Sequence, residues 1–461
     1  MSRLRYFIAL WASKAAYVCL RLLKRNATMF PGRVALKICP DYLAQTAKSK
    51  NLLCVTGTNG KTTTTNLVAD ILTECGYRVV SNRYGSNINT GVATALTHTV
   101  NIFGKPNKAD MVVLEVDERF SRLILPFIKP DYLIVTNLFR DSIKRNAHPE
   151  YIFSILDTYV PGNTKLILNA DCLQSSQLLK NNQRTFFAID RLPTDVTECI
   201  NLINDFSICP ECGTKLKFNY LRYHHIGNAF CPKCGFKSFE PDYRITHIDY
   251  EKEEITVSLR GKEENFHMIN KIIYNIYNEL AAITLLSEFG VDLEKVKGYL
   301  SNVNITRTRY HESKAGKTDI VRIMAKGQNS VSCSRTLDYV GHESGDRTVF
   351  IMIDDIFERK DSSEFIGWIY DADFEFLNTP EIKQIVLAGP RCFDYRLRML
   401  IAGVDESRLL CEQDEFKAVD IMDKDIDKLY LLHDTSTFDL SCEVEQKIIR
   451  VFSEYKGGEG K

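Results

Sequence analysis

Val55-Thr-Gly-Thr-Asn-Gly-Lys-Thr-Thr-Thr64 joins a short apolar run, NLLCV, to a segment with helical spacing, TTNLVADILTECG. A strand, a glycine loop and a helix in this order are typical of a phosphate-binding loop. Gly57 and Gly60 allow a tight turn that aims backbone N–H groups inward, and the start of the helix adds a partial positive charge. Lys61 is placed to reach the outer phosphates, and Thr62 is placed to offer a hydroxyl to Mg²⁺.

Composition indicates a multidomain protein of balanced charge. A chain of 461 residues exceeds one ordinary core, so two or three domains are expected. The 59 basic and 59 acidic residues cancel, so the total charge gives no indication of a nucleic-acid partner. The 14 cysteines lack disulfide-framework spacing outside one cluster, which favours a reducing, cytoplasmic location.

The N-terminal segment has basic flanks and an apolar middle, but charged residues interrupt it. Its uncharged runs are much shorter than the ~20 residues that a membrane-spanning helix needs. We expect an amphipathic helix that packs its apolar stripe against the protein's own core. The alternative is a basic helix that lies on the inner face of the plasma membrane. The stripe comprises Leu4, Ile8, Trp11, Ala15, Val18 and Leu22.

The remaining pattern predicts an α/β protein with two parallel-sheet units. The apolar runs NLLCVTG, RVVSN, MVVLEV and DYLIVTN alternate with helical segments between about 51 and 140. A second such unit begins near Thr318, with TDIVRIMAK, TVFIMID, QIVLAGP and LYLLHD. The predicted division is a lead-in over 1–50, a phosphate-loop domain over 51–312 and a C-terminal α/β domain over 313–461.

One cysteine cluster has the spacing of a metal site. Cys209-Pro-Glu-Cys212-Gly and Cys231-Pro-Lys-Cys234-Gly share the pattern C-P-x-C-G. Each tight turn lets two thiolates bind one ion, and the glycine accommodates the turn. Four thiolates leave no open position, which predicts a structural zinc in an insertion over 205–240. Iron and a pair of disulfides are the alternatives.

With these residues in view, the chain resembles the MurT family of Mur-ligase-like subunits. G-T-N-G-K-T is the Mur ligase form of the loop, and GSNINTGVATAL, LEVDE and VTNLFRD follow it as in the family. YNIYNELAA resembles the Mur motif N-x-x-N-x-x-A-A, and WIYDADFEFL resembles the family's WIWDxDFE. The four-cysteine ribbon also lies where the family carries one. The resemblance implies a Mur-ligase ATPase domain with an inserted zinc ribbon, followed by a Rossmann-like C-terminal domain.

The resemblance also implies an activity. MurT phosphorylates, with ATP, the α-carboxylate of D-glutamate in the lipid II stem peptide. Ammonia from a partner glutaminase, GatD, then displaces the phosphate to give D-isoglutamine in peptidoglycan synthesis. The implied ATP-binding residues are Gly57, Thr58, Asn59, Gly60, Lys61, Thr62, Thr63, Asn275, Asn278 and Arg309.

Several of these assignments have a physical rationale. Glu115 ends an apolar strand at the carboxyl edge of the sheet, where ligands bind, so Thr62 and Glu115 are the expected Mg²⁺ ligands. Asn275 and Asn278 share one helix face, which lets both amides meet one adenine edge. Residues that resemble positions near ATP or the acceptor are Asn87, Thr90, Asn137 and Arg140.

The C-terminal part departs from the family pattern. Arg309 and Glu312 are the counterparts of a family arginine and glutamate, and Lys326 is expected near the phosphates although its surroundings differ. A family aspartate completes the partner's Cys–His pair by orienting the histidine. Its expected counterpart here is Asp361; Asp354, Asp355 and Asp371 are alternatives. Lys61, Glu115, Lys326 and Asp361 are thus the predicted catalytic set.

Two other functions stay open from the residues. A free-standing Mur-type ligase would join an amino acid to a carboxylate and commonly uses a modified lysine, for which Lys180 is available. A nucleotide-binding scaffold would hold a partner without chemistry, although Lys61, Thr62 and Glu115 argue against it. A diverged relative with another acceptor is a further alternative.

Overall fold

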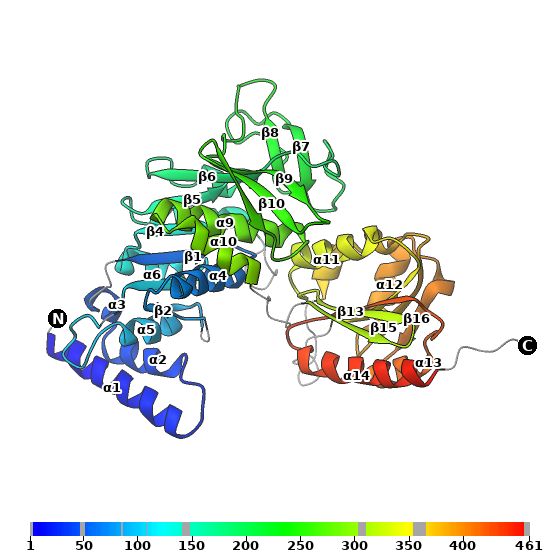
Figure 1. Ribbon diagram of the computed structural model, residues 1–461, viewed down its shortest axis with the longest axis horizontal. Coiled ribbons are helices and arrows are strands. Elements are labelled where there is room, and N and C mark those ends of the chain that lie inside the picture. Colours follow the sequence, from blue (N-terminus) through cyan, green and yellow to red (C-terminus); the bar gives the residue numbers. More distant parts are fainter. Residues whose placement is uncertain are drawn as a thin grey trace, which may run out of the picture. The chain divides into compact units, whose positions relative to one another are not determined.

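The computed structural model describes residues 3–46, 51–83, 86–107, 109–140, 148–302, 310–353 and 366–455. These residues form two units (Figure 1). The described residues up to Phe139, with His148–Ile200 and 204–302, form the first unit. Arg140, 201–203, 310–353 and 366–455 form the second.

The first unit is built on a nine-stranded sheet. The strand order is β11-β10-β9-β6-β5-β4-β1-β3-β2. Neighbours from β2 to β9 are parallel, and β9, β10 and β11 form an antiparallel meander. The strands are β1 (Leu52–Thr56), β2 (Val79–Ser81), β3 (Met111–Glu115), β4 (Tyr132–Val135), β5 (Lys165–Asn169), β6 (Arg184–Ile189), β9 (Tyr243–Asp249), β10 (Glu254–Leu259) and β11 (Lys262–His267).

Helices cover both faces of this sheet. Leu52 and Cys54 of β1 share one apolar cluster with α3, α5, α6 and α8. Because side chains alternate along a strand, Leu53 and Val55 point to the other face, where α4 and α9 pack together. The helices are α2 (Phe30–Ile38), α3 (Tyr42–Gln45), α4 (Lys61–Glu74), α5 (Asn89–His98), α6 (Ser121–Ile128), α8 (Pro149–Tyr159), α9 (Ile273–Phe289) and α10 (Leu293–Asn302).

The N-terminal helix α1 (Arg3–Leu22) packs on the unit, but not through the predicted stripe. Its buried residues are Tyr6, Ala9, Leu10 and Ser13. Leu4, Trp11 and Val18, by contrast, are 65%, 52% and 54% exposed. The expectation that the apolar stripe faces the protein's own core is therefore wrong. Ile8 and Leu22 of the same stripe are exposed as well.

Polar anchoring explains this orientation of α1. Ser13 Oγ lies 3.2 Å from Thr97 Oγ1, and Lys14 Nζ donates to the carbonyls of Thr97 and Val100 at the end of α5. A lysine at a helix C-terminus meets the negative end of the dipole. Hydropathy alone does not report these contacts. Among the described residues, no helix combines the length and apolarity needed to cross a bilayer.

The cysteine segment is an insertion between the parallel neighbours β6 and β9. It contains a two-stranded antiparallel hairpin, β7 (Lys217–Tyr223) and β8 (Ile226–Phe230). The two cysteine turns lie on either side of this hairpin in sequence. A small apolar cluster that includes Leu173, Leu216 and Phe236 surrounds Cys209 and Cys231. The inserted ribbon predicted from the sequence is confirmed in its fold.

The second unit is a six-stranded sheet in the order β12-β13-β17-β14-β15-β16. All neighbours are parallel except the edge strand β12, which runs antiparallel to β13. The predicted start near Thr318 therefore omits this edge strand. The elements are β12 (Tyr310–Ala315), β13 (Thr318–Met324), α11 (Ser330–His342), β14 (Arg347–Met352), β15 (Ile382–Ala388), α12 (Cys392–Ile401), β16 (Leu409–Glu412), α13 (Glu415–Ile421), β17 (Lys428–His433) and α14 (Phe438–Glu454).

Candidate nucleotide and metal sites

The phosphate loop, residues 57–60, connects β1 to α4 at the carboxyl edge of the first sheet. Gly57 and Gly60 have φ values of +127° and +86°, a region that favours glycine. A Cβ at Gly60 would also lie 2.0 Å from Asn278 Oδ1, so the loop and α9 need a residue without a side chain here. Thr64 N–H donates to Gly60 O at the start of α4, and the N–H groups of a helix's first turn are not used by the helix's own hydrogen-bond ladder. This geometry is that of an anion-binding helix start.

The segment after β4 holds the phosphate loop in place through hydrogen bonds. Thr58 N–H donates to Asn137 O (2.9 Å), and Asn59 N–H donates to Asn137 Oδ1 (3.0 Å). Asn137 Nδ2 and Thr136 Oγ1 both donate to Asn59 O, and Thr58 Oγ1 accepts from Phe139 N–H at 2.9 Å. Asn137, predicted as a ligand-binding residue, thus shapes the loop. The N–H groups of Thr58 and Asn59 are engaged within the protein.

Lys61 is held by a partner that the sequence reasoning did not select. Its Nζ donates to Glu118 Oε2 (2.8 Å), to Thr58 O (3.1 Å) and to Gly57 O. Glu118 is only 2% exposed. Burial works to lower the pKa of Lys61, but the adjacent acidic groups, with Glu118 first, outweigh it and raise that pKa. The ammonium therefore stays charged beside the loop.

Glu115 is positioned through both its backbone and its side chain. Asn87 Nδ2 donates to Glu115 Oε1 at 2.8 Å. Asn82 closes a reciprocal pair with the Glu115 backbone, accepting from its N–H and donating to its carbonyl, each at 2.9 Å. A half-buried carboxylate oriented by an amide is a suitable oxygen ligand for Mg²⁺. Thr62 lies half-buried on the first turn of α4.

The two asparagines of α9 differ in burial. Asn278 is 3% exposed and lies against Gly60, whereas Asn275 is half-buried nearer the helix start. The neighbouring Tyr277 donates to Asp171 Oδ2 at 2.6 Å. Glu279, next along the helix, is 2% exposed and accepts from Ile269 N–H. Asn278 therefore packs on the loop, and whether Asn275 meets a base stays a prediction. Thr90 lies half-buried on the first turn of α5.

A buried polar network ties the inserted hairpin to α9. Arg222 of β7 pairs with Asp195 at 2.7 Å and with Asp171 at 3.5 Å. Tyr220 and Tyr277 both donate to Asp171, and the Arg222 guanidinium lies over both rings. Buried charges need such partners, so this network fixes the hairpin on the sheet.

The turn of the hairpin reaches the segment that braces the phosphate loop. His225 and Phe139 have ring centroids 4.5 Å apart, and His225 Nε2 lies 3.5 Å from Cys172 Sγ. Burial lowers the pKa of His225 to about 4, so the ring is neutral. His224 is also buried and contacts Phe139 edge-on. These two histidines, which lie in the spacer between the two cysteine turns, join the ribbon to the residue that holds Thr58.

The four cysteines meet as the sequence predicts. The Sγ atoms of Cys209, Cys212, Cys231 and Cys234 all lie within 4.8 Å of one another, and all four are free thiols rather than disulfides. The glycines after the second cysteine of each turn, Gly213 and Gly235, have φ values of +70° and +81°. A tetrahedral ion with metal–sulfur distances of about 2.3 Å fits this set and leaves no open position.

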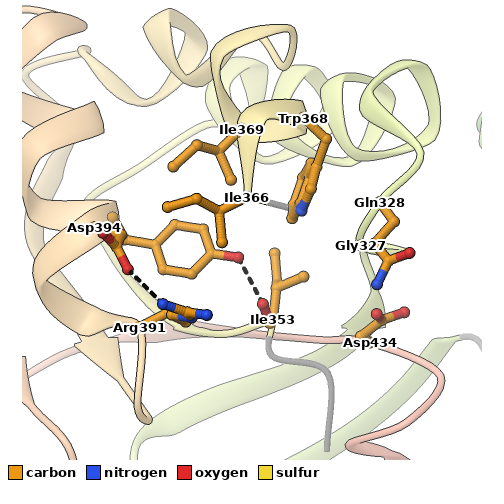
Figure 2. A pocket seen from close by; sticks show the side chains of 10 residues that line it. Gly327, Gln328, Ile353, Ile366, Trp368, Ile369, Arg391, Asp394 and Asp434 are labelled. Carbon is orange, nitrogen blue, oxygen red and sulfur yellow. Dashed lines mark hydrogen bonds and ion pairs between the residues drawn. The ribbon is translucent and has the colours of Figure 1, made fainter. Parts of the chain in front are cut away.

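The second unit has its own pocket at the carboxyl edge of its sheet (Figure 2). Tyr395 lines the pocket and donates to Ile353 O at 2.5 Å. Figure 2 shows Trp368 above and Asp434 below the opening beside Gly327 and Gln328. Lys326 (φ +28°) lies two residues after the end of β13 and precedes the pocket residue Gly327. The remaining lining residues are Gln328, Ile366, Ile369, Arg391 and Asp394.

The structure describes only some of the residues predicted for the C-terminal part. Asp361, Asp354, Asp355 and Arg309 lie outside the described residues. Asp371, the remaining candidate for the partner's triad, pairs with Arg140 at 3.4 Å within the second unit. Glu312 is exposed on β12.

The buried Arg398 fixes the segment that carries Asp371. Its side chain donates to the carbonyls of Ile369 and Ala372 and to the Glu375 carboxylate.

Comparison with known proteins gives two family-model matches and relatives that align with about nine-tenths of the chain. The Mur ligase middle domain matches residues 55–192, and the MurT ligase C-terminal domain matches residues 327–438. The MurT subunit of lipid II isoglutaminyl synthase (glutamine-hydrolyzing) from Staphylococcus aureus (strain COL) is 28% identical, covering 90% of this chain and 92% of that protein. The subunit from Streptococcus pneumoniae (strain ATCC BAA-255 / R6) is 28% identical, covering 88% and 89%.

Solved structures show the same fold. A pseudomurein peptide ligase type C from Methanothermus fervidus matches with a TM-score of 0.65 and 20% identity, covering 88% of this chain and 80% of that chain. MurF from Acinetobacter baumannii matches with a TM-score of 0.61 and 15% identity, covering 91% and 80%. The MurT relatives are named as subunits of a synthase and the two matched family models describe ligase domains, so this chain is an enzyme of the ligase class. It is similar to MurT subunits over 90% of its length, with a match to the Mur ligase middle domain ahead of a match to the MurT ligase C-terminal domain.

Proposed function

We propose that the chain is the ATP-using subunit of an amidoligase that converts the D-glutamate α-carboxylate of the lipid II stem peptide into an amide. The observation that carries this proposal is the buried Lys61–Glu118 pair, 2.8 Å apart, beside the phosphate loop, in a chain similar to MurT subunits over 90% of its length. Those relatives are named as glutamine-hydrolyzing, which supports a GatD-type glutaminase as the source of ammonia.

The proposed reaction has two steps. An oxygen of the acceptor carboxylate attacks the γ-phosphorus of ATP, and the bond to the β-phosphate oxygen breaks to release ADP. Ammonia then attacks the acyl carbon, phosphate leaves with the bonding electrons, and the nitrogen loses a proton. Lys61 would offset the charge on the γ-phosphoryl oxygens. Thr62 and Glu115 would hold Mg²⁺, which supplies further charge neutralisation on the phosphates when bound.

Glu118 has a distinct part in this scheme. It is placed to hold the Lys61 ammonium at the loop before nucleotide arrives, because the pair is buried and 2.8 Å apart. The four-cysteine site would hold zinc for structure alone, since four thiolates close its coordination shell.

Mass spectrometry of the acceptor tests the proposal directly. The full chain is mixed with ATP, Mg²⁺ and a lipid-free D-glutamate-containing muropeptide, with ammonium chloride as the amine. We expect the amide and ADP in equal amounts, and loss of both in Lys61→Ala. Lys165→Ala, an exposed lysine on β5, is the matched control and should leave turnover unchanged.

The same assay separates the alternatives. Glutamine should replace ammonium only when a GatD-type subunit is added. A product that carries an amino acid in place of ammonia would establish a free-standing Mur-type ligase. Nucleotide binding with no product from either nitrogen source would establish a scaffold.

A further inference from the structure

One surface of the first unit is apolar and without a packing partner among the described residues. It is formed by the outer side of α1, at the edge of the unit that Figure 1 labels N. The helix has a buried side against α2 and α5, so its exposed side is the outermost layer. The exposed apolar residues of this side are Leu4 (65%), Ile8 (46%), Trp11 (52%), Val18 (54%) and Leu22 (78%).

A neighbouring loop extends this surface. Trp11 Nε1 donates to Ile102 O at 2.8 Å, which fixes the indole beside the loop after α5. Ile102 and Phe103 in that loop are 55% and 68% exposed. Large aromatic and aliphatic side chains rarely gather on the surface of a soluble protein unless something binds there. We call these seven residues the α1 face.

The charge around the α1 face has one sign. Residues 1–40 contain no aspartate or glutamate, although the whole chain has equal numbers of acidic and basic residues. Lys24 and Arg25 line a surface hollow with Leu20, Asn26 and Phe30 at the end of α1. The exposed cations of this segment are Arg3, Arg21, Lys24, Arg25, Arg33 and Lys37.

We propose that the α1 face docks onto the headgroup region of an anionic lipid bilayer. A helix with an apolar face, a basic polar face and an indole at the boundary lies in the membrane interface, with its apolar side chains among the acyl chains. The cations meet lipid phosphates, and their attraction weakens with added salt. A protein partner is less well matched, because an interface core is depleted of charge and residues 1–40 carry six exposed cations and no acidic residue.

Docking would place the first unit beside a lipid-linked acceptor, a consequence that rests on the proposed function. The docking itself does not depend on it. Lipid binding is therefore measured without nucleotide or acceptor.

Vesicle co-sedimentation with the full chain tests the docking. Vesicles of phosphatidylcholine alone are compared with vesicles of equal parts phosphatidylcholine and phosphatidylglycerol. We expect binding to the anionic vesicles, at least tenfold weaker for Ile8→Asp and for Trp11→Asp. The triple variant Arg21→Glu, Lys24→Glu, Arg25→Glu should bind equally poorly. Ile401→Asp, which changes a 59% exposed apolar residue of α12, is the matched control and should bind normally.

Tryptophan fluorescence gives an independent reading. The chain has two tryptophans, and Trp368 is 7% exposed whereas Trp11 lies on the α1 face. Anionic vesicles should shift the emission to shorter wavelength, and Trp11→Phe should remove the shift while keeping the binding. Circular dichroism checks that every variant is folded.

Two results would overturn the docking. One is equal sedimentation of the wild-type chain and the Ile8→Asp variant. The other is concentration-dependent self-association that Ile8→Asp abolishes without any lipid binding, which would make the α1 face a protein interface. Turnover of the lipid-free muropeptide should be the same in Ile8→Asp as in wild type. Failure of that turnover in wild type would reject the proposed function and leave the lipid result standing.

Discussion

At Gly60, the absence of a side chain lets the phosphate loop and α9 meet. Alanine there would place Cβ 2.0 Å from Asn278 Oδ1 and would keep a φ of +86° that favours glycine. We expect Gly60→Ala to reduce ATP turnover about a hundredfold, because small displacements of a loop that positions reacting groups have effects of this size. Steady-state turnover with ammonium as amine measures it.

Gly76, at the other end of α4, provides the matched control. Its φ is +91°, yet an added Cβ would meet no atom within 4 Å. Gly76→Ala should therefore cost only about 1 kcal/mol of stability from backbone strain and leave turnover unchanged. Equal loss of turnover in both variants would mean that strain, rather than the contact with Asn278, is responsible.

Glu279 makes the stability of the first unit depend on pH. Burial raises the pKa of its carboxyl to about 8, against a single hydrogen bond from Ile269 N–H that lowers it. The folded state thus keeps a proton that the unfolded chain loses above its ordinary pKa of about 4.5. The contribution of protonated Glu279 to the free energy of unfolding is complete below pH 4.5 and declines as the pH rises toward 8.

Replacing Glu279 with glutamine removes this dependence. Glu279→Gln should flatten the fall in unfolding free energy between about pH 4.5 and 8 and should stabilise the protein at pH 8 by on the order of a few kcal/mol. Urea unfolding across this range measures the slope. Unchanged slopes in the variant would show that Glu279 is ionised in the folded protein.

Among the elements, the inserted hairpin connects the four-cysteine site to the phosphate loop. Its turn places His225 against Phe139, and Phe139 N–H holds Thr58 of the phosphate loop. Loss of the metal site should loosen this contact. We expect Cys231→Ser to lose bound metal, to lower the unfolding temperature and to weaken ATP binding about tenfold.

Metal analysis, calorimetry and nucleotide titration measure these three effects separately. Cys442→Ser, a half-buried cysteine on α14, is the control and should change none of them. Metal loss with unaltered ATP affinity would show that the hairpin holds its turn in place without the ion.

The same elements show what the sequence could and could not predict. The phosphate loop, the strand that ends at Glu115 and the cysteine turns have local signatures, because each depends on glycine or ligand spacing over a few residues. The Lys61–Glu118 pair joins residues 57 positions apart. The LEVDE motif contains Glu118, but the position at the carboxyl end of the apolar strand pointed only to Glu115. The hairpin turn and the orientation of α1 depend on distant polar contacts, which no periodicity reports.

For the whole molecule, the predicted reacting groups are divided between two units with separate cores. The first carries the phosphate loop, and the second carries Lys326 at the carboxyl edge of its own parallel sheet. Ligands of open parallel sheets bind at such edges.

Substitution of Lys326 tests whether the second unit takes part in the phosphate chemistry. If it acts on the phosphates from the second unit, Lys326→Ala should leave ATP affinity within about twofold, because the phosphate loop is intact, and should reduce amide formation about a hundredfold. Equilibrium nucleotide titration and product analysis measure the two quantities. Lys314→Ala, a 65% exposed lysine on β12 that pairs with Asp319, is the matched control and should retain full activity. A variant at Lys326 that turns over normally would place all phosphate chemistry in the first unit, and the second would then serve the acceptor or the glutaminase alone.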